Sequence, residues 1–289
     1  MTTPNVQLPS GVTWTALGCA VLRARESQRP DGLFAGPLAV ALVAQVKENG
    51  VIPTTVISPD AEWLYGEYIT LRTKFIDVRL LAAADQGIKQ IVVLGAGLDG
   101  RGYRLDWPSG VQIYEVDMPE LLTYKQSIVE VAGLQSTAKK IHSVPCDLSV
   151  DDWLSRLCEY GFAPAERTAW LLEGILGYLE PGQKDSLVSL LSATSPSSSH
   201  LIACYGIGDS FGAARRAGRQ DQVVTKVNNL KAKGPPGPPR TWLSPHGWDP
   251  MEETTIRAWA TRLARAKPPG MDPDQGGAEF YLVDARRSL

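Results

Sequence analysis

The sequence contains few residues of the kinds that build disulfides and metal sites. It has four cysteines and three histidines in 289 residues, and no two cysteines form a Cys-x-x-Cys pair. It also lacks a His-Glu-x-x-His motif, a Cys/His cluster and an acidic triplet of the EF-hand type, so we expect no metal. So few cysteines in a chain of this size are typical of a reducing compartment, and we expect a cytoplasmic protein.

Signals for export or for a membrane are missing as well. The first residues, MTTPNVQLPSGVTW, have neither the basic segment nor the apolar segment of a signal peptide. The sequence has no run of about 18 apolar residues, the minimum for a transmembrane helix. We therefore expect no association with a membrane.

The sequence has no large excess of either positively or negatively charged residues. The 29 lysines and arginines nearly balance the 31 acidic residues, giving a net charge of −2. This balance argues against a nucleic-acid-binding protein, which usually carries a basic excess. A hydrophobic content of 44% and a charged content of 21% are ordinary for a globular protein, and the length allows one or two domains. Gly-x-Ser-x-Gly is absent, so a hydrolase nucleophile of that type is not expected.

The pattern of apolar residues changes near residue 87. Before it, helices are expected within 16–48, interrupted by a turn at Asp31-Gly32, and over 60–86, where Gly87 ends the helix. After it, strands alternate with helices, which predicts an α/β fold with a mostly parallel sheet and helices on both faces. Strands are expected at 90–94, 111–117, 141–147, 168–174, 200–206 and 279–285, and helices at 119–132, 151–160, 182–193 and 254–266.

One segment departs from this alternation. Residues 209–233 are polar and basic and are expected to form a helical insertion, followed by a Pro/Gly loop at 231–240. Other loops are expected at 50–59 and 268–277. Pro145 has no amide donor, which favours an edge position for the third strand. We therefore divide the chain into a helical cap, residues 1–87, and an α/β domain, residues 88–289, with a cap insertion at about 209–250.

A glycine-rich loop follows the first expected strand. Gly95-Ala-Gly-Leu-Asp-Gly100 has the form Gly-x-Gly-x-x-Gly, and Asp117 closes the next strand 20 residues after Gly97. Glycines let the backbone turn sharply and approach a ligand, and an acid at that strand end accepts hydrogen bonds from ribose hydroxyls. This combination predicts a nucleoside-binding half at the carboxyl ends of the strands.

Two cofactors fit such a half, a dinucleotide or S-adenosylmethionine. A dinucleotide requires a full helix directly after the loop, because the helix N-terminus holds the pyrophosphate. Here Gly102 and Pro108 leave room for barely two turns. The sequence therefore favours S-adenosylmethionine, while an NAD-dependent oxidoreductase stays open as an alternative.

Six stretches together resemble the leucine carboxyl methyltransferase family, whose bacterial members include carboxyl O-methyltransferases of the tetracenomycin type. The stretches are Thr15-Ala-Leu-Gly with Arg23-Ala-Arg-Glu-Ser-Gln-Arg-Pro-Asp, Arg72-Thr-Lys-Phe-Ile-Asp, Val93-Leu-Gly-Ala-Gly-Leu-Asp-Gly-Arg-Gly-Tyr-Arg-Leu, Glu115-Val-Asp-Met-Pro, Pro145-Cys-Asp-Leu, and Trp170-Leu-Leu-Glu-Gly-Ile-Leu-Gly-Tyr-Leu. They span roughly residues 15–205. The resemblance implies a class I S-adenosylmethionine-dependent methyltransferase, a Rossmann-like sheet with an N-terminal helical cap.

The resemblance also implies a cofactor site. Arg72 would pair with the methionine carboxylate, with Arg23 as a second basic contact, and Asp117 would take the ribose hydroxyls. Asp147 and Leu148 would frame the adenine, and Glu173 would lie near the amino group. The implied cofactor-binding residues are Arg23, Arg72, Gly95, Ala96, Gly97, Asp117, Met118, Asp147, Leu148, Glu173 and Gly174.

Simple physical arguments agree with these roles and leave alternatives. A buried acid in the apolar stretch around Glu173 is costly unless it is paired. Asp147 is also placed to cap the helix expected at 151–160, and Arg72 could be a surface charge. The sequence departs from the family at Gly100, Gly102 and Gly36, and the extra glycines predict a more flexible loop.

The acceptor is the least determined part. A carboxylate is ionised at pH 7 and needs no general base, whereas a phenol normally does. His246 is the best base candidate of the three histidines, and Tyr178 and Tyr205 are candidates for the acceptor pocket. We expect an O-methyltransferase acting on a small-molecule or peptide carboxylate of secondary metabolism, as a monomer or weak homodimer. A phenol or hydroxyl acceptor and a non-catalytic cofactor-binding protein are the alternatives.

Overall fold

A seven-stranded sheet forms the centre of the computed structural model, which describes residues 13–48, 59–149, 152–207, 233–269, 271 and 279–288. The strand order is β3-β2-β1-β4-β5-β7-β6. The strands are β1 (Gln90–Leu94), β2 (Gln112–Asp117), β3 (Lys140–Pro145), β4 (Thr168–Glu173), β5 (His200–Gly206), β6 (Trp248–Thr255) and β7 (Phe280–Arg287). β1 to β5 pair in parallel, and β7 runs antiparallel between β5 and β6. The predicted α/β class with a mostly parallel sheet is confirmed.

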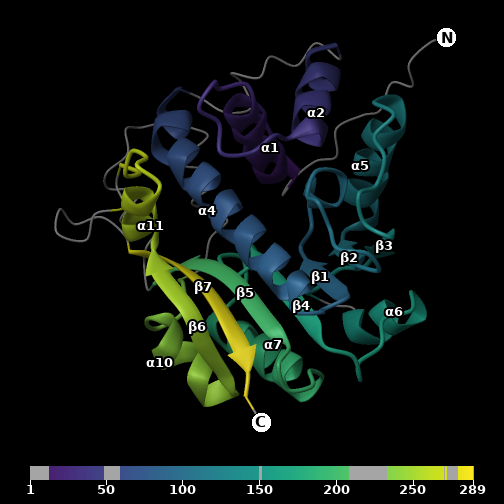
Figure 1. Ribbon diagram of the computed structural model, residues 1–289, viewed down its shortest axis with the longest axis vertical. Helices are drawn as coiled ribbons and strands as arrows, with labels where there is room; N and C mark the ends of the chain where they lie inside the picture. Colours follow the sequence, from purple (N-terminus) through teal and green to yellow (C-terminus); the bar gives the residue numbers. More distant parts are fainter. Residues whose placement is uncertain are drawn as a thin grey trace.

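Helices cover both faces of the sheet (Figure 1). They are α1 (Thr13–Ser27), α2 (Pro37–Glu48), α4 (Pro59–Asp85), α5 (Pro119–Val131), α6 (Trp153–Glu159), α7 (Pro181–Ala193), α10 (Pro239–Leu243) and α11 (Ile256–Arg262), with 3-10 turns η1 (Arg101–Tyr103) and η2 (Ser244–His246). α4, α5 and α11 share one core with one face of the sheet, and α6, α7 and α10 share a second core with the other face. α1 and α2 pack together on the first side, and their apolar residues belong to its core.

The local reasons for this arrangement are visible in the sequence. β1 and β4 are apolar runs buried along almost their whole length, as strands covered on both faces should be. β3 lies at the edge of the sheet and ends at Pro145, as its missing amide donor predicted. Gly87 ends α4 with a positive φ of 89°, the predicted left-handed cap.

The sequence analysis missed β6. Its residues alternate between buried and exposed, but Pro250 and two glutamates give the stretch the composition of a loop. β6 tolerates the proline because it is an edge strand that pairs only with β7, with an irregular register between Pro250 and Glu252. The helix expected at 254–266 is correspondingly too long. Thr255 is the N-cap of α11, because its hydroxyl oxygen accepts from the amide of Ala258.

Several predicted segments fall where little of the chain is described. The loop at 50–59, the helical insertion at 209–233 and the loop at 268–277 lie mostly outside the described residues. Of the Pro/Gly loop, residues 233–238 have no regular structure, but Pro239 already begins α10. The predicted boundary at residue 87 separates elements that share one core, because α4 packs directly against β5 and β7.

Two chemical points complete the description. All four cysteines lie in described parts of the chain, and each is a free thiol. Among the described helices, none combines the length and the apolar character that spanning a membrane requires.

A buried ion cluster ties the end of the chain to its beginning. Arg265, just after α11, donates to Glu26 of α1 at 3.0 and 3.1 Å and to Glu67 of α4 at 2.9 and 3.2 Å. The side chain of Arg265 is 7% exposed and that of Glu26 is 3% exposed. Since an unpaired buried charge is costly, each partner depends on the other.

We expect Arg265→Ala to lower the free energy of unfolding by about 3 kcal/mol, because it leaves the buried Glu26 carboxylate without its principal partner. Arg262→Ala is the matched control. Arg262 is 58% exposed and pairs with Glu252 at the surface, so its loss should cost at most about 1 kcal/mol. Urea unfolding of both variants measures the difference, and equal losses would contradict a structural role for the cluster.

Candidate active site

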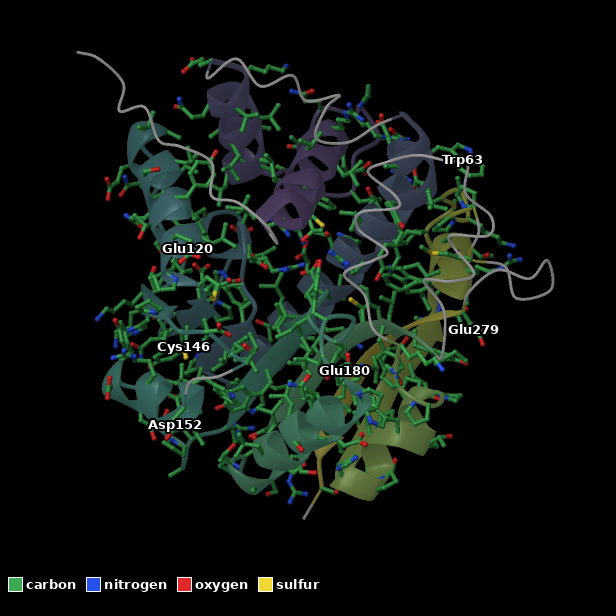
Figure 2. All side chains as sticks on the ribbon, turned by 180° about the vertical axis from the view of Figure 1, so that it is seen from behind. Trp63, Glu120, Cys146, Asp152, Glu180 and Glu279 are labelled. Carbon is green, nitrogen blue, oxygen red and sulfur yellow. The ribbon has the colours of Figure 1, made fainter. Side chains whose placement is uncertain are left out.

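A cavity of about 770 Å³ opens at the carboxyl ends of the parallel strands. Its walls come from the ends of β1, β2, β4 and β5, from the segment after β3, and from α1 and α4. This volume suits a small-molecule site, and the position follows the rule that parallel α/β sheets bind ligands beyond their carboxyl ends. Figure 2 labels two residues of its wall, Glu120 at the start of α5 and Cys146 just after β3.

The structure brings almost all of the predicted site residues to this one cavity. Those that line it are Arg23, Arg72, Gly95, Ala96, Gly97, Asp117, Met118, Asp147, Leu148, Glu173, Gly174, Tyr178 and Tyr205. They come from seven separate parts of the chain, so the fold itself, and not local sequence, assembles them.

The glycine loop turns sharply out of β1. Gly95 and Gly97 have positive φ angles of 67° and 52°, and the amides of Gly95 and Ala96 both donate to the carbonyl of Val116, at 2.9 and 3.1 Å. The loop continues into η1 only, so no full helix N-terminus faces it. This confirms the short connection that argued against a dinucleotide.

Gly102, one of the extra glycines, lies in a closely packed place. This glycine is buried in η1, and a Cβ atom there would lie 2.5 Å from Cδ1 of Ile141. The absence of a side chain at Gly102 therefore allows η1 to pack closely against Ile141 of β3.

Asp117 closes β2 beside the loop. Its two carboxylate oxygens accept from the amides of Gly97 at 2.6 Å and Met118 at 2.7 Å. Burial raises the pKa of Asp117, while these two hydrogen bonds favour its charged form. Each oxygen has a further lone pair, so the carboxylate can accept from two neighbouring hydroxyls of a ligand.

Glu173, at the end of β4, is held by three arginines. Oε1 accepts from Arg23 at 2.6 Å and from Arg72 at 2.8 Å, and Oε2 accepts from Arg101 at 2.6 Å. Burial works to raise the pKa of Glu173, but the charges of Arg101, Arg23 and Arg72 hold that pKa well below its ordinary range. The predicted need for a buried partner is confirmed, and two of the three partners, Arg23 and Arg72, are the residues expected to face a ligand carboxylate.

The sequence analysis missed the second layer of this cluster. Arg101 also bonds to Asp99 and, through Nε, to Asp77 at 2.7 Å, and Arg104 bonds to the same oxygen of Asp77 at 2.7 Å. Four guanidinium groups thus share three carboxylates, which leaves one positive charge for an anionic ligand group. The only sequence signal was a charged Asp-Gly-Arg directly after the loop glycines.

Arg72 lies where a carboxylate ligand could reach it. It is buried on α4, with its guanidinium 5.1 Å from the ring centre of Tyr68, and its Nη2 lies 3.7 Å from the sulfur of Cys19. The alternative of a surface charge is therefore wrong. Nη2 of Arg101 is also buried, without a hydrogen-bond partner among the described residues, so the cluster holds unused donor capacity.

Asp147 lies on the opposite wall, just after β3. Its Oδ1 accepts from the amide and hydroxyl of Ser149 at 2.9 and 2.6 Å, and these bonds lower its pKa. The alternative role as a helix cap is wrong, because Asp152 caps α6 by accepting from the amide of Ser155. Asp147 and Leu148 are thereby left facing the cavity.

None of the three histidines, all of which are described, lines the cavity. His142 stacks on Tyr114 with ring centres 4.3 Å apart, and His200 bonds to the buried Asp284 at 2.7 Å. His246 lies in η2, on the α7 side of the sheet, where Nδ1 is 3.0 Å from the hydroxyl of Ser189. The prediction of His246 as a base is wrong, because the turn that carries it packs on α7 and not at the strand ends.

Both tyrosines that were candidates for the acceptor pocket, Tyr178 and Tyr205, line the cavity. The hydroxyl of Tyr178 donates to Thr15 of α1 at 2.9 Å, and burial raises its pKa to about 12. The hydroxyl of Tyr205 donates to the carbonyl of Gly237 at 3.3 Å, and burial raises its pKa as well. Neither phenol is suited to accept a proton near pH 7. Within the described ranges, no group of three or more His, Cys, Asp or Glu side chains is arranged to hold a metal.

Solved structures similar to this chain include two methyltransferases. One, from Thermobifida fusca and named provisionally, is 16% identical over 79% of this chain and 87% of its own, with a TM-score of 0.49. The other, magnesium protoporphyrin IX methyltransferase from Synechocystis, is 12% identical over 80% of this chain and 88% of its own, with a TM-score of 0.48.

Sequence relatives cover nearly the whole chain. Three are provisionally named S-adenosyl-L-methionine-dependent methyltransferases. The relative of Parafrankia sp. is 37% identical over 97% of this chain and 88% of its own length. The relative of Frankia alni is 34% identical over 98% of this chain and 97% of its own length. The third, of Mycobacterium tuberculosis, is 33% identical over 92% and 91%. Residues 16–192 match the profile of the leucine carboxyl methyltransferases. The chain therefore belongs to the leucine carboxyl methyltransferase family.

Proposed function

We propose that this chain transfers a methyl group from S-adenosyl-L-methionine to a carboxylate oxygen of a natural product or modified peptide. Family membership and the names of the relatives support the cofactor and the methyl transfer. The choice of acceptor rests on the chemistry of the cavity wall.

The residues at the strand ends fit this cofactor. Asp117 has free acceptor capacity for two ribose hydroxyls, and the excess positive charge around Glu173 suits a carboxylate. Glu173 itself offers a carboxylate to an ammonium group, and Asp147 offers an acceptor to the adenine amine. When bound, the cofactor supplies an electrophilic methyl group on a sulfonium.

The described residues of the cavity wall, which include no histidine and no lysine, carry the proposal for the acceptor. The three histidines of the protein lie elsewhere, Glu173 is engaged by three arginines, and the pKa of Tyr178 is far above neutrality. A carboxylate acceptor, with a pKa of about 4, is ionised without help. A phenol, with a pKa of about 10, would reach this cavity protonated, and the described residues of the wall offer no histidine or lysine to take the proton.

The remaining task of the chain is to align the acceptor and keep water out. The wall on the α4 side presents Tyr65, Tyr68 and Ile69, and the segment after β4 presents Ile175 and Leu179. These side chains are apolar or aromatic, so they favour an acceptor whose body is apolar. An acceptor carboxylate that enters such a wall loses hydration, which leaves its oxygen more reactive.

Asp117→Ala should weaken the binding of S-adenosylhomocysteine by about 1–3 kcal/mol, because the ribose hydroxyls lose their acceptor. Isothermal titration calorimetry measures the change. Asp85→Ala serves as the control, since Asp85 is an exposed aspartate at the end of α4 outside the cavity. An Asp117→Ala protein that binds as tightly as the control would refute the assigned cofactor site.

With a carboxylate acceptor found by screening, we expect kcat to stay flat between about pH 6.5 and 9, because the acceptor is ionised throughout. A phenolic acceptor would instead give a rate that rises about tenfold for each pH unit below its pKa of about 10. Steady-state rates at saturating cofactor distinguish the two. A rising profile with no transfer to any carboxylate would rule out the proposed acceptor class.

A further inference from the structure

A short Pro/Gly segment forms part of the cavity wall opposite the cofactor residues. This segment, residues 233–238, is here called the strap, and it leads directly into α10. Gly234 and Pro235 of the strap line the cavity together with Tyr205 and Gly206. A Cβ atom on Gly234 would overlap the carbonyl oxygen of Gly206. The strap therefore lies in direct backbone contact with the end of β5.

A buried lysine fastens the strap to the rest of the wall. Lys184 is on α7, one turn after the N-cap Glu180 that Figure 2 labels, and its side chain is 1% exposed. Its Nζ donates to the carbonyl of Lys233, at 2.6 Å, and to the carbonyl of Leu179. Because a buried ammonium is costly unless its donors are satisfied, these two carbonyls are held firmly.

Two further bonds hold the strap along its length. The hydroxyl of Tyr205 donates to Gly237 at 3.3 Å, and Asp185, beside Lys184, accepts from the indole of Trp242 in α10 at 2.8 Å. The strap is thus anchored before, within and after its Pro/Gly run. Lys184 thus bonds to two segments, at Leu179 and at the strap, and both contribute to the cavity wall.

We propose that Lys184 is a positioning residue that holds the strap as the acceptor-side wall of the cavity and so determines which acceptors fit. This inference rests on the proposed methyl transfer. Lys184 does not line the cavity, so it acts through Leu179 and the strap. The wall it sets in place carries no charge at Gly234, Pro235 and Leu179, which favours a carboxylate whose non-reacting part is apolar.

The first test needs no acceptor. Cys204 is 3% exposed and lines the cavity two residues before Gly206, whereas Cys158 is exposed on α6. In Lys184→Met, we expect iodoacetamide to label Cys204 at least about tenfold faster than in the natural protein, since the strap loses a charged hydrogen bond. Mass spectrometry measures labelling, with Cys158 as the internal reference. Lys139→Met, at an exposed lysine remote from the cavity, should leave Cys204 as slow as before.

The second test uses the acceptor found in the carboxylate screen. Lys184→Met should raise the KM for that acceptor about tenfold with a smaller change in kcat, and should leave the affinity for S-adenosylhomocysteine within about twofold. Lys184→Arg, which keeps a charged donor, should recover part of the KM. A general loss of folding would instead lower the cofactor affinity and the melting temperature together.

Gly234→Ala displaces the strap at its contact with β5, without changing Lys184. It keeps the inference testable if Lys184→Met does not fold. Its Cβ must displace the strap from Gly206, so Cys204 labelling and acceptor KM should again rise. Unchanged labelling and unchanged KM in both variants would overturn the role of the strap. Failure of every carboxylate acceptor would refute the proposed function, while the labelling result would still decide whether Lys184 holds the strap.

Discussion

Glu173 stands at the end of a strand whose neighbours are apolar, and its carboxylate is removed from water. Such a charge can be buried only if it is paired, and the protein pairs it with Arg23 from α1, Arg72 from α4 and Arg101 from η1. Three elements that are distant in the sequence must therefore meet at the carboxyl end of β4. The cavity forms at this meeting point, and its surplus positive charge is a consequence of the same pairing.

The sheet provides the other half of the site by geometry alone. Parallel strands end at the same edge, so Asp117 of β2 and Asp147 after β3 line the same cavity as Glu173, although the three residues are far apart in the sequence. The sharp loop after β1 lies between them and presents backbone rather than side chains. The histidines, by contrast, lie away from this edge, in β3, at the start of β5 and in η2, so none of them lines the cavity.

Part of this arrangement could be predicted from the sequence, because Gly95, Asp117 and Glu173 stand at the ends of apolar runs typical of strands. Arg23 and Arg72 lie on helices and were expected only from the family resemblance. Arg101 and Asp77 were not predicted as site residues. They form an ion pair between positions more than 20 residues apart, and no local sequence pattern indicates such a pair. β6 was missed because an edge strand tolerates Pro250 and acids that a central strand would not. His246 was misplaced because nothing in its neighbours tells which side of the sheet a turn will face.

The ion cluster at Arg265 joins residues 239 positions apart, since it binds Glu26 of the first helix. During synthesis, α1 and its Glu26 emerge long before their final partner, Arg265, exists. Until the ribosome has delivered residue 265, the nascent chain holds a carboxylate on α1 without the guanidinium that secures it. The wall that α1 gives to the cavity thus lacks this contact until residue 265 has been made, and a chain that stops earlier does not hold α1 in this way.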